Sequence, residues 1–217
     1  YTGTTTVSSG TLLVDGSTAA ASVVSVAADG TLGGTGTVSG AVNLAAGGKL
    51  APGNAGIGTL TLADAGASAL TLNGSALAFR LSDTAGIADQ LNVAGTLVLN
   101  GANTVSLSCP LVGAPAGVYT LLTYSATSGT GTLALDRAYP NATLNVGATS
   151  VTLIVSGTGT FDSLVWLGDG IDNAWDTVTA NWSAGTYGDN MAVIFDDSGS
   201  ADPAVTITPA AVSPFSV

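Results

Sequence analysis

A pattern of turn residues recurs through the first half of the chain at a nearly constant interval. An apolar residue, two small residues, a Gly turn and a return to Leu occur at 7–12, 26–32 and 44–50. Continued along the chain, the pattern gives six anchors spaced 18 or 19 residues apart: Val7, Val26, Leu44, Leu62, Leu81 and Leu99. A repeat of fixed length predicts structural units that each pack on their neighbours.

Between the anchors, small or apolar residues alternate with Thr, Ser and Asn, as at 59–62, 70–72 and 95–99. Alternation with a period of two predicts short, half-buried strands, and three such strands separated by turns fit one coil of a β-helix. Residues 1–108 are therefore predicted to form the stacked coils of a parallel β-helix, or solenoid, with the six anchors in one inward column. A β-sandwich is the alternative, although it requires no repeat of fixed length.

The charged residues favour an all-β fold. All fourteen acidic residues are Asp, against one Lys and two Arg. Without Glu and nearly without Lys or Arg, the chain has few residues for solvated helical faces, whereas its Thr, Val and Gly suit strands and turns. The formal net charge of −11 also makes nucleic acid an unexpected partner, because phosphates are bound by cations. No apolar run is long enough for this segment to insert into a membrane.

The pattern changes twice along the chain. Prolines interrupt the residues that follow Ser108, and longer alternating stretches appear, so residues 109–157 are predicted to be capping β-strands that protect one end of the helix. Residues 158–217 hold all three Trp and eight of the fourteen Asp. They are predicted to form a small Trp/Asp-rich β unit, the start of a further repeat unit.

Three segments, at 1–14, 30–38 and 48–62, resemble the autotransporter-associated β-strand repeat, also called the passenger-associated transport repeat. The resemblance covers about the first quarter of the chain. It implies a right-handed parallel β-helix in the passenger region of a large exported bacterial protein. The motifs at 166–170 and 181–182 resemble the Trp-rich opening of a further unit in the same multi-repeat, autotransporter-like proteins.

Most catalytic arrangements cannot be built from this sequence. The chain has no His and no Glu, which removes Ser-His-Asp and Cys-His arrangements and every zinc site that contains His. The adjacent Asp196 and Asp197 point to opposite faces if they lie on a strand, so they do not converge on one substrate. We therefore expect no enzymatic activity, no catalytic residue and no cofactor.

Two weak candidate sites lie in residues 158–217. The first is a calcium site, with oxygen ligands from Asp169, Asp172, Asn173 and Asp176. Their spacing does not match an EF-hand loop, and turns held by side-chain to backbone hydrogen bonds are the simpler interpretation. The second is a sugar-stacking platform made by Trp166, Trp175 and Trp182. The simpler interpretation is that these rings fill the core of the small unit.

The sequence thus predicts a non-enzymatic, extracellular or cell-surface segment with a structural or adhesive role, and a carbohydrate-binding module is the alternative. Residues 1–7 begin inside a coil, and 204–208 and 215–217 look like strands of an unfinished unit. We therefore expect the chain to partner itself, through tandem units or through head-to-tail strand pairing near Tyr1 that builds a filament. A surface glycan is the alternative partner.

Overall fold

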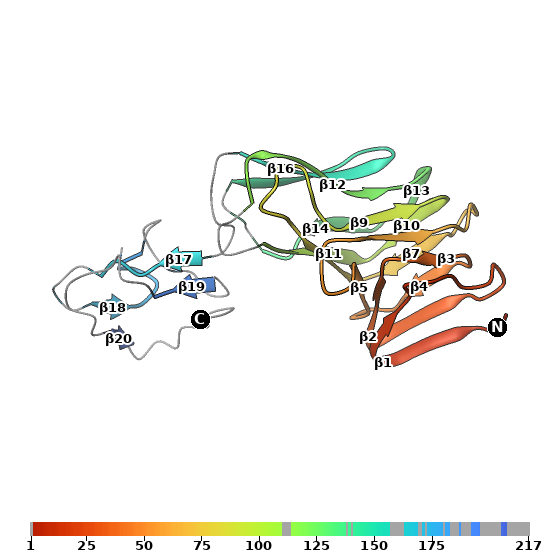
Figure 1. Cartoon of the computed structure of the whole chain (residues 1–217), viewed down its shortest axis with the longest axis horizontal. Coiled ribbons are helices and arrows are strands. Elements are labelled where there is room, and N and C mark those ends of the chain that lie inside the picture. The colour runs from red at the N-terminus through yellow and green to blue at the C-terminus, as the bar shows by residue number, and fades with distance from the viewer. Residues whose placement is uncertain are drawn as a thin grey trace. The chain divides into compact units, whose positions relative to one another are not determined.

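The structure is a computed structural model in which every described element is a β-strand (Figure 1). It divides the chain into two compact units, Tyr1–Gly159 and Thr160–Val217. Among the described residues, no helix is long and apolar enough to cross a membrane. The described residues are 2–109, 114–137, 139, 141–156, 163–168, 171, 173–179, 181–182, 187, 192–195 and 205–207.

Sheet A of the first unit has ten strands in the order β13-β10-β7-β4-β2-β5-β8-β11-β14, with β1 paired to the other side of β2. Its pairings are parallel, and the long β2 carries two shorter strands in line along one side. The strands are β1 (Thr5–Leu13), β2 (Val24–Gly34), β4 (Val42–Leu44), β5 (Lys49–Pro52), β7 (Leu70–Asn73), β8 (Ala76–Arg80), β10 (Thr96–Asn100), β11 (Ala102–Ser108), β13 (Ala126–Gly129) and β14 (Thr132–Leu135).

Sheet B of the first unit has six strands in the order β15-β16-β12-β9-β6-β3. The pairs from β3 to β12 are parallel, but β12 pairs with β16, and β16 with β15, in antiparallel fashion. The strands are β3 (Thr37–Val38), β6 (Thr59–Leu62), β9 (Gln90–Val93), β12 (Gly117–Thr123), β15 (Ala142–Val146) and β16 (Ser150–Val155).

The predicted right-handed parallel β-helix is wrong. Sheet A is a mostly parallel half-barrel and sheet B is mixed, whereas the prediction required uniform coils of parallel strands. The chain is all-β, but the distance along the sequence between paired strands is not constant. Residues 114–137 add β13 and β14 to sheet A and β12 to sheet B, so both sheets continue past Ser108.

The pairing register shows where the predicted repeat fails. Cα partners run from Val7 to Val26, Leu44, Leu72 and Leu99, so four of the six predicted anchors share one column. The step from Leu44 to its partner Leu72 is 28 residues, because the intervening chain also builds a strand of sheet B. The other two anchors do not belong to this column. Leu62 pairs with Val38 and Val93 in sheet B, and Leu81 forms an isolated bridge.

The core of the first unit consists mainly of aliphatic side chains from alternate strand positions. Leu32, Leu50, Leu77 and Val105 follow one another as Cα partners, and none of them is exposed to solvent. Each fully buried aliphatic side chain contributes about 1.5–3 kcal/mol. The same short strands therefore build the hydrogen-bonded sheet and the core.

A close approach of two backbone segments requires glycine at position 36. A Cβ atom there would lie 2.0 Å from the carbonyl oxygen of Gly16 and 2.7 Å from the carbonyl carbon of Asp15. The amide of Gly36 donates to the carbonyl of Val14 at 2.8 Å, which fixes the separation of the two segments. No larger residue fits at this position without displacing the backbone.

The second unit has shorter strands and an aromatic core. The parallel pairs are β17 (Ser163–Val165) with β19 (Ala192–Ile194), and β18 (Ala174–Trp175) with β20 (Thr206–Ile207). Between them an isolated antiparallel bridge joins Trp166 to Trp182. The buried core cluster consists of Trp166, Trp175, Trp182, Tyr187 and Val193.

Candidate functional site

The three tryptophans proposed as a sugar platform are buried together in the second unit. Trp166, Trp175 and Trp182 are 4%, 5% and 2% exposed. Trp182 meets Trp166 edge to face, with ring centroids 4.9 Å apart, and meets Trp175 in the same way at 5.3 Å. Sugar stacking requires an open ring face, and here each ring is buried against its neighbours. The structure places them in the core.

The aromatic core leaves several polar atoms unpaired. Within the described residues, the indole Nε1 atoms of the three tryptophans and Oδ1 of Asn181 are buried without a hydrogen-bond partner. The side-chain nitrogen Nδ2 of Asn181 does donate a hydrogen bond, to the carbonyl of Ala174 at 2.9 Å. A buried donor that loses water without gaining a partner costs about 1–3 kcal/mol. Packing of the aromatic rings therefore stabilises this core, and the buried polar atoms without partners offset part of that stabilisation.

Only two of the four calcium candidates, Asn173 and Asp176, lie within the described residues. Asp169 and Asp172 lie outside the described residues, as do Asp196 and Asp197. Asn173 is buried and adopts a left-handed backbone conformation with φ of 48°. Among the residues that the structure describes, no group of three or more His, Cys, Asp or Glu side chains could hold a metal ion.

Asp176, the remaining calcium candidate, binds its own turn. Its Oδ1 accepts hydrogen bonds from the amides of Thr179 at 2.6 Å and Val178 at 2.8 Å, and its Oδ2 accepts from the Thr179 hydroxyl at 2.8 Å. These bonds lower the pKa of the Asp176 carboxyl, and the Thr179 amide has the largest effect. The carboxylate thus serves as a turn residue in this structure.

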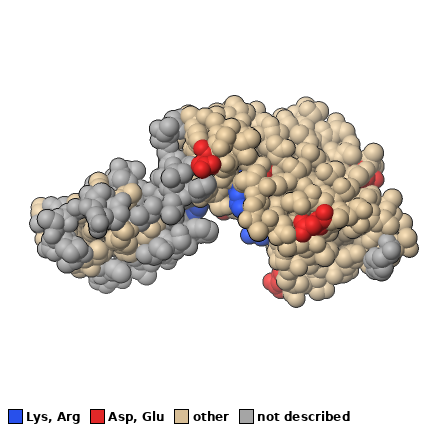
Figure 2. All heavy atoms as spheres, viewed as in Figure 1, with Lys and Arg blue, Asp and Glu red and all other residues tan. Residues whose placement is uncertain are grey.

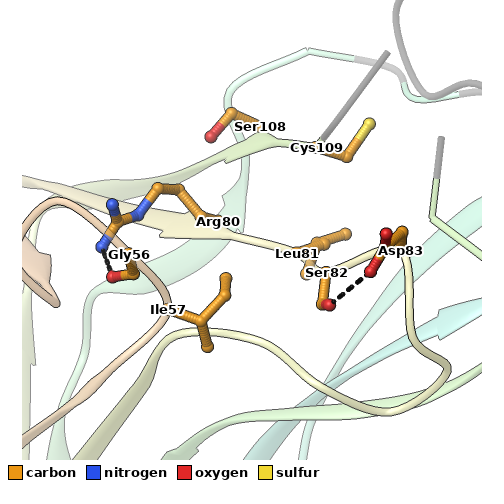
Figure 3. A pocket seen from close by; sticks show the side chains of 8 residues that line it. All are labelled: Gly56, Ile57, Arg80, Leu81, Ser82, Asp83, Ser108 and Cys109. Carbon is orange, nitrogen blue, oxygen red and sulfur yellow. Dashed lines mark hydrogen bonds between the residues drawn. The ribbon is translucent and has the colours of Figure 1, made fainter. Parts of the chain in front are cut away.

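A shallow cavity in the first unit was not predicted from the sequence. It has a volume of about 350 Å³ and lies at the ends of β8 and β11, beside the loop that precedes β6 (Figure 3). Its lining combines apolar, hydroxyl, thiol and charged groups: Gly56, Ile57, Arg80, Leu81, Ser82, Asp83, Ser108 and Cys109. The lining residues come from three distant parts of the sequence, so no local motif could indicate it.

Arg80 in this cavity is held by its own chain. Its Nε donates to Oδ2 of Asp89 at 2.8 Å, and Nη2 donates to the carbonyl of Gly56. Asp89 is only 1% exposed and also accepts from the amides of Gly58 at 2.8 Å and Arg80 at 2.9 Å. This ion pair fastens the 52–58 loop.

Other carboxylates in the first unit have similar structural roles. Asp15 accepts from the amide and hydroxyl of Thr35 and from the side-chain amide of Asn54. Asp136 accepts from the Tyr139 hydroxyl at 2.8 Å. On the face shown in Figure 2, the charged side chains of this unit are few and scattered over an uncharged surface. These acidic groups hold loops and strand ends in place.

Comparison with known proteins identifies no relative from which a site could be transferred. No family model matches the chain, and no curated protein matches it. Function therefore has to be inferred from the residues and from the geometry of the two units.

Proposed function

We propose that this chain is a non-enzymatic structural or adhesive segment of a multi-repeat bacterial protein that acts outside the cell or on its surface. The observation that supports this most is the stack of strands in sheet A. Each strand pairs in parallel with the next from β1 to β13 and β14, with aliphatic side chains inward. Such a sheet adds length strand by strand, because each strand contacts only its neighbours.

The use of charged and polar groups supports the same role. The carboxylates of Asp15, Asp89 and Asp136 accept hydrogen bonds from the chain itself. The outward positions of the central strands are occupied mainly by short side chains such as Thr, Ser, Asn and Ala. The resemblance of residues 1–14, 30–38 and 48–62 to a repeat of exported bacterial proteins supports the surface location.

Carbohydrate binding is the weaker alternative. It relied on Trp166, Trp175 and Trp182, which pack against one another and leave no open ring face. The cavity beside Arg80 gives it no support either, because the guanidinium that would bind sugar hydroxyls is engaged by Asp89 and by the carbonyl of Gly56.

The location can be tested by labelling cells of the source bacterium with an antibody raised against the purified chain. We expect labelling of intact cells, with little increase after permeabilisation. Labelling that appears only after permeabilisation would place the protein inside the cell and overturn the proposal. Incubation of the purified chain with a panel of polysaccharides should release no reducing ends, and sustained turnover would contradict the non-enzymatic role.

A further inference from the structure

The outer edge of β1 carries backbone groups that no described strand pairs. β1 pairs with β2 alone among the described residues. Successive amides along a strand point to opposite sides, and the amide of Thr5 donates inward to the carbonyl of Val23 at 2.8 Å. The amide of Thr6 therefore points away from the sheet, which leaves an edge able to accept one more strand.

The opposite end of sheet A presents a second edge of the same kind. β13 and β14 are the last strands of the sheet order and continue β10 and β11. The amides of Ser125 and Gly131 donate inward, to the carbonyls of Gly95 and Leu99. Within β13, Thr127 lies opposite Leu97, and the odd-numbered residues of β10 direct their carbonyls towards β13, as Leu99 does, so the amide of Ser128 points inward and that of Thr127 points outward. β15 lies close to β14 but forms its ladder with β16, so among the described strands none pairs with the outer side of β13 or β14.

The two edges match in direction and in register. β1 covers both halves of β2, with Val7 opposite Val26 and Leu12 opposite Leu32. Along the same two columns, the far edge ends with Gly129 opposite Leu99 and Leu135 opposite Val105. All these pairings are parallel. A further strand that paired with β13 and β14 in the same register would therefore run in the same direction as β1 and span the same two columns.

Neither edge has the features that usually prevent strands from pairing between molecules. Exposed edges of natural sheets are commonly protected by charged residues or Pro. β1, β13 and β14 contain neither. The terminal column members Leu12 and Leu135 are only partly buried, whereas the interior members are fully buried. One more strand at either end would complete the burial of these side chains.

We propose that the first unit self-associates head to tail, with the β1 edge of one copy pairing in parallel with the β13–β14 edge of the next. This inference rests on the proposed structural role and names the partner, a second copy of the chain. The two edges differ from each other, so the contact does not close on itself and each added copy presents a free edge. The net charge of −11 on each copy opposes association, so added salt should strengthen it.

Two proline variants of the full chain test the contact. Thr6→Pro removes an outward amide from the β1 edge, and Thr127→Pro removes one from the β13–β14 edge. Thr6→Ala and Thr127→Ala are matched controls that keep the backbone donors. Sedimentation velocity is measured over a concentration series at low and at physiological salt, about 0.15 M. A reducing agent excludes disulfides between copies through Cys109.

We expect the unmodified chain and both Ala controls to assemble with rising concentration, and each Pro variant alone to stay monomeric. An equimolar mixture of the two Pro variants should form dimers and nothing larger, because only the β1 edge of Thr127→Pro and the β13–β14 edge of Thr6→Pro remain intact. A monomeric unmodified chain, a Thr127→Pro variant that still assembles, or a mixture without dimers would each overturn the inference.

Hydrogen exchange of the unmodified chain provides a test that does not depend on whether the variants fold. Amides in 5–13 and 126–135 should become protected together as the concentration rises. Unchanged exchange in either segment would contradict the contact. A chain that assembles but is found inside cells would overturn the proposed function and leave this contact intact. A chain that is exposed on the cell surface but stays monomeric would overturn the contact and leave the proposed function intact.

Discussion

The two units of this chain bury their apolar side chains in different ways. In the first, fully buried aliphatic residues such as Leu44, Leu50 and Leu72 follow the register of a hydrogen-bonded sheet. In the second, the described strands are two or three residues long, and Trp166, Trp175 and Trp182 pack around one another. An aliphatic column can be lengthened by one strand, whereas a ring cluster closes on itself. The loss of one residue should therefore affect the two units differently.

The largest effect is expected from Trp182→Ala. This ring is 2% exposed and touches both other tryptophans, so its removal should cost the second unit about 3–5 kcal/mol. All three tryptophans lie in this unit, so tryptophan fluorescence during urea unfolding monitors it selectively. Val178→Ala, at a side chain that is 79% exposed, is the control and should change little. An unchanged midpoint for Trp182→Ala would mean that the ring cluster does not hold this unit.

In the first unit, Gly36→Ala should cost about 3 kcal/mol, because the new methyl group meets backbone atoms that cannot move without breaking strand pairing. Gly16→Ala is the matched control, since its Cβ would meet nothing within 4 Å. It should stay within about 0.5 kcal/mol of the unmodified chain. Urea unfolding followed by far-ultraviolet circular dichroism measures both. Equal midpoints for the two variants would show that the close approach at Gly36 is relaxed in solution.

Asp89→Asn should destabilise the first unit by about 2 kcal/mol. The change removes the charge opposite Arg80, and partial exposure of the arginine limits the loss through solvent screening. Asp83→Asn, at an exposed carboxylate that accepts hydrogen bonds from the adjacent Ser82 and Thr84, should be nearly neutral. Urea unfolding compares the two variants. An unchanged free energy of unfolding for Asp89→Asn would show that the 52–58 loop is held without the ion pair.

The smallest effect concerns alkaline pH. Burial raises the pKa of Tyr139 to about 12, with a further increase from its hydrogen bond to Asp136, although the Leu107 backbone opposes the shift. The pKa of Tyr139 in the folded chain is above the unfolded value of about 10. The stabilisation of the folded chain by the neutral Tyr139 is therefore complete below about pH 10 and is lost as the pH rises towards about 12.

At alkaline pH the free energy of unfolding of the first unit should fall by about 1–2 kcal/mol. Urea unfolding between about pH 9 and pH 12 measures it, and Tyr139→Phe should make the pH dependence shallower, because the replacement cannot ionise. Tyr119 and Tyr124 also have raised pKa values, so some dependence should remain. An unchanged pH profile for Tyr139→Phe would contradict the assignment.

Part of the candidate site geometry could be anticipated from the sequence. Asp176 forms the turn that its residue type favours, and the tryptophans make up most of the buried core cluster of the second unit. The pairing of Arg80 with Asp89 could not be anticipated. Nothing in the sequence between them indicates that a short bridge from Leu81 to Ala88 returns the chain to the guanidinium.

The sequence by itself determined that the chain is all-β and which strand positions face inward, since alternation with a period of two marks them locally. It also located the turns where Gly interrupts that alternation. Only the tertiary structure decided which strands pair. Shifting a strand by an even number of residues keeps the same side chains inward, so the alternation alone could not distinguish Leu62 from Leu72, the true partner of Leu44. The physical reason is that register is fixed by contacts between distant segments, and the loops that bring those segments together differ in length.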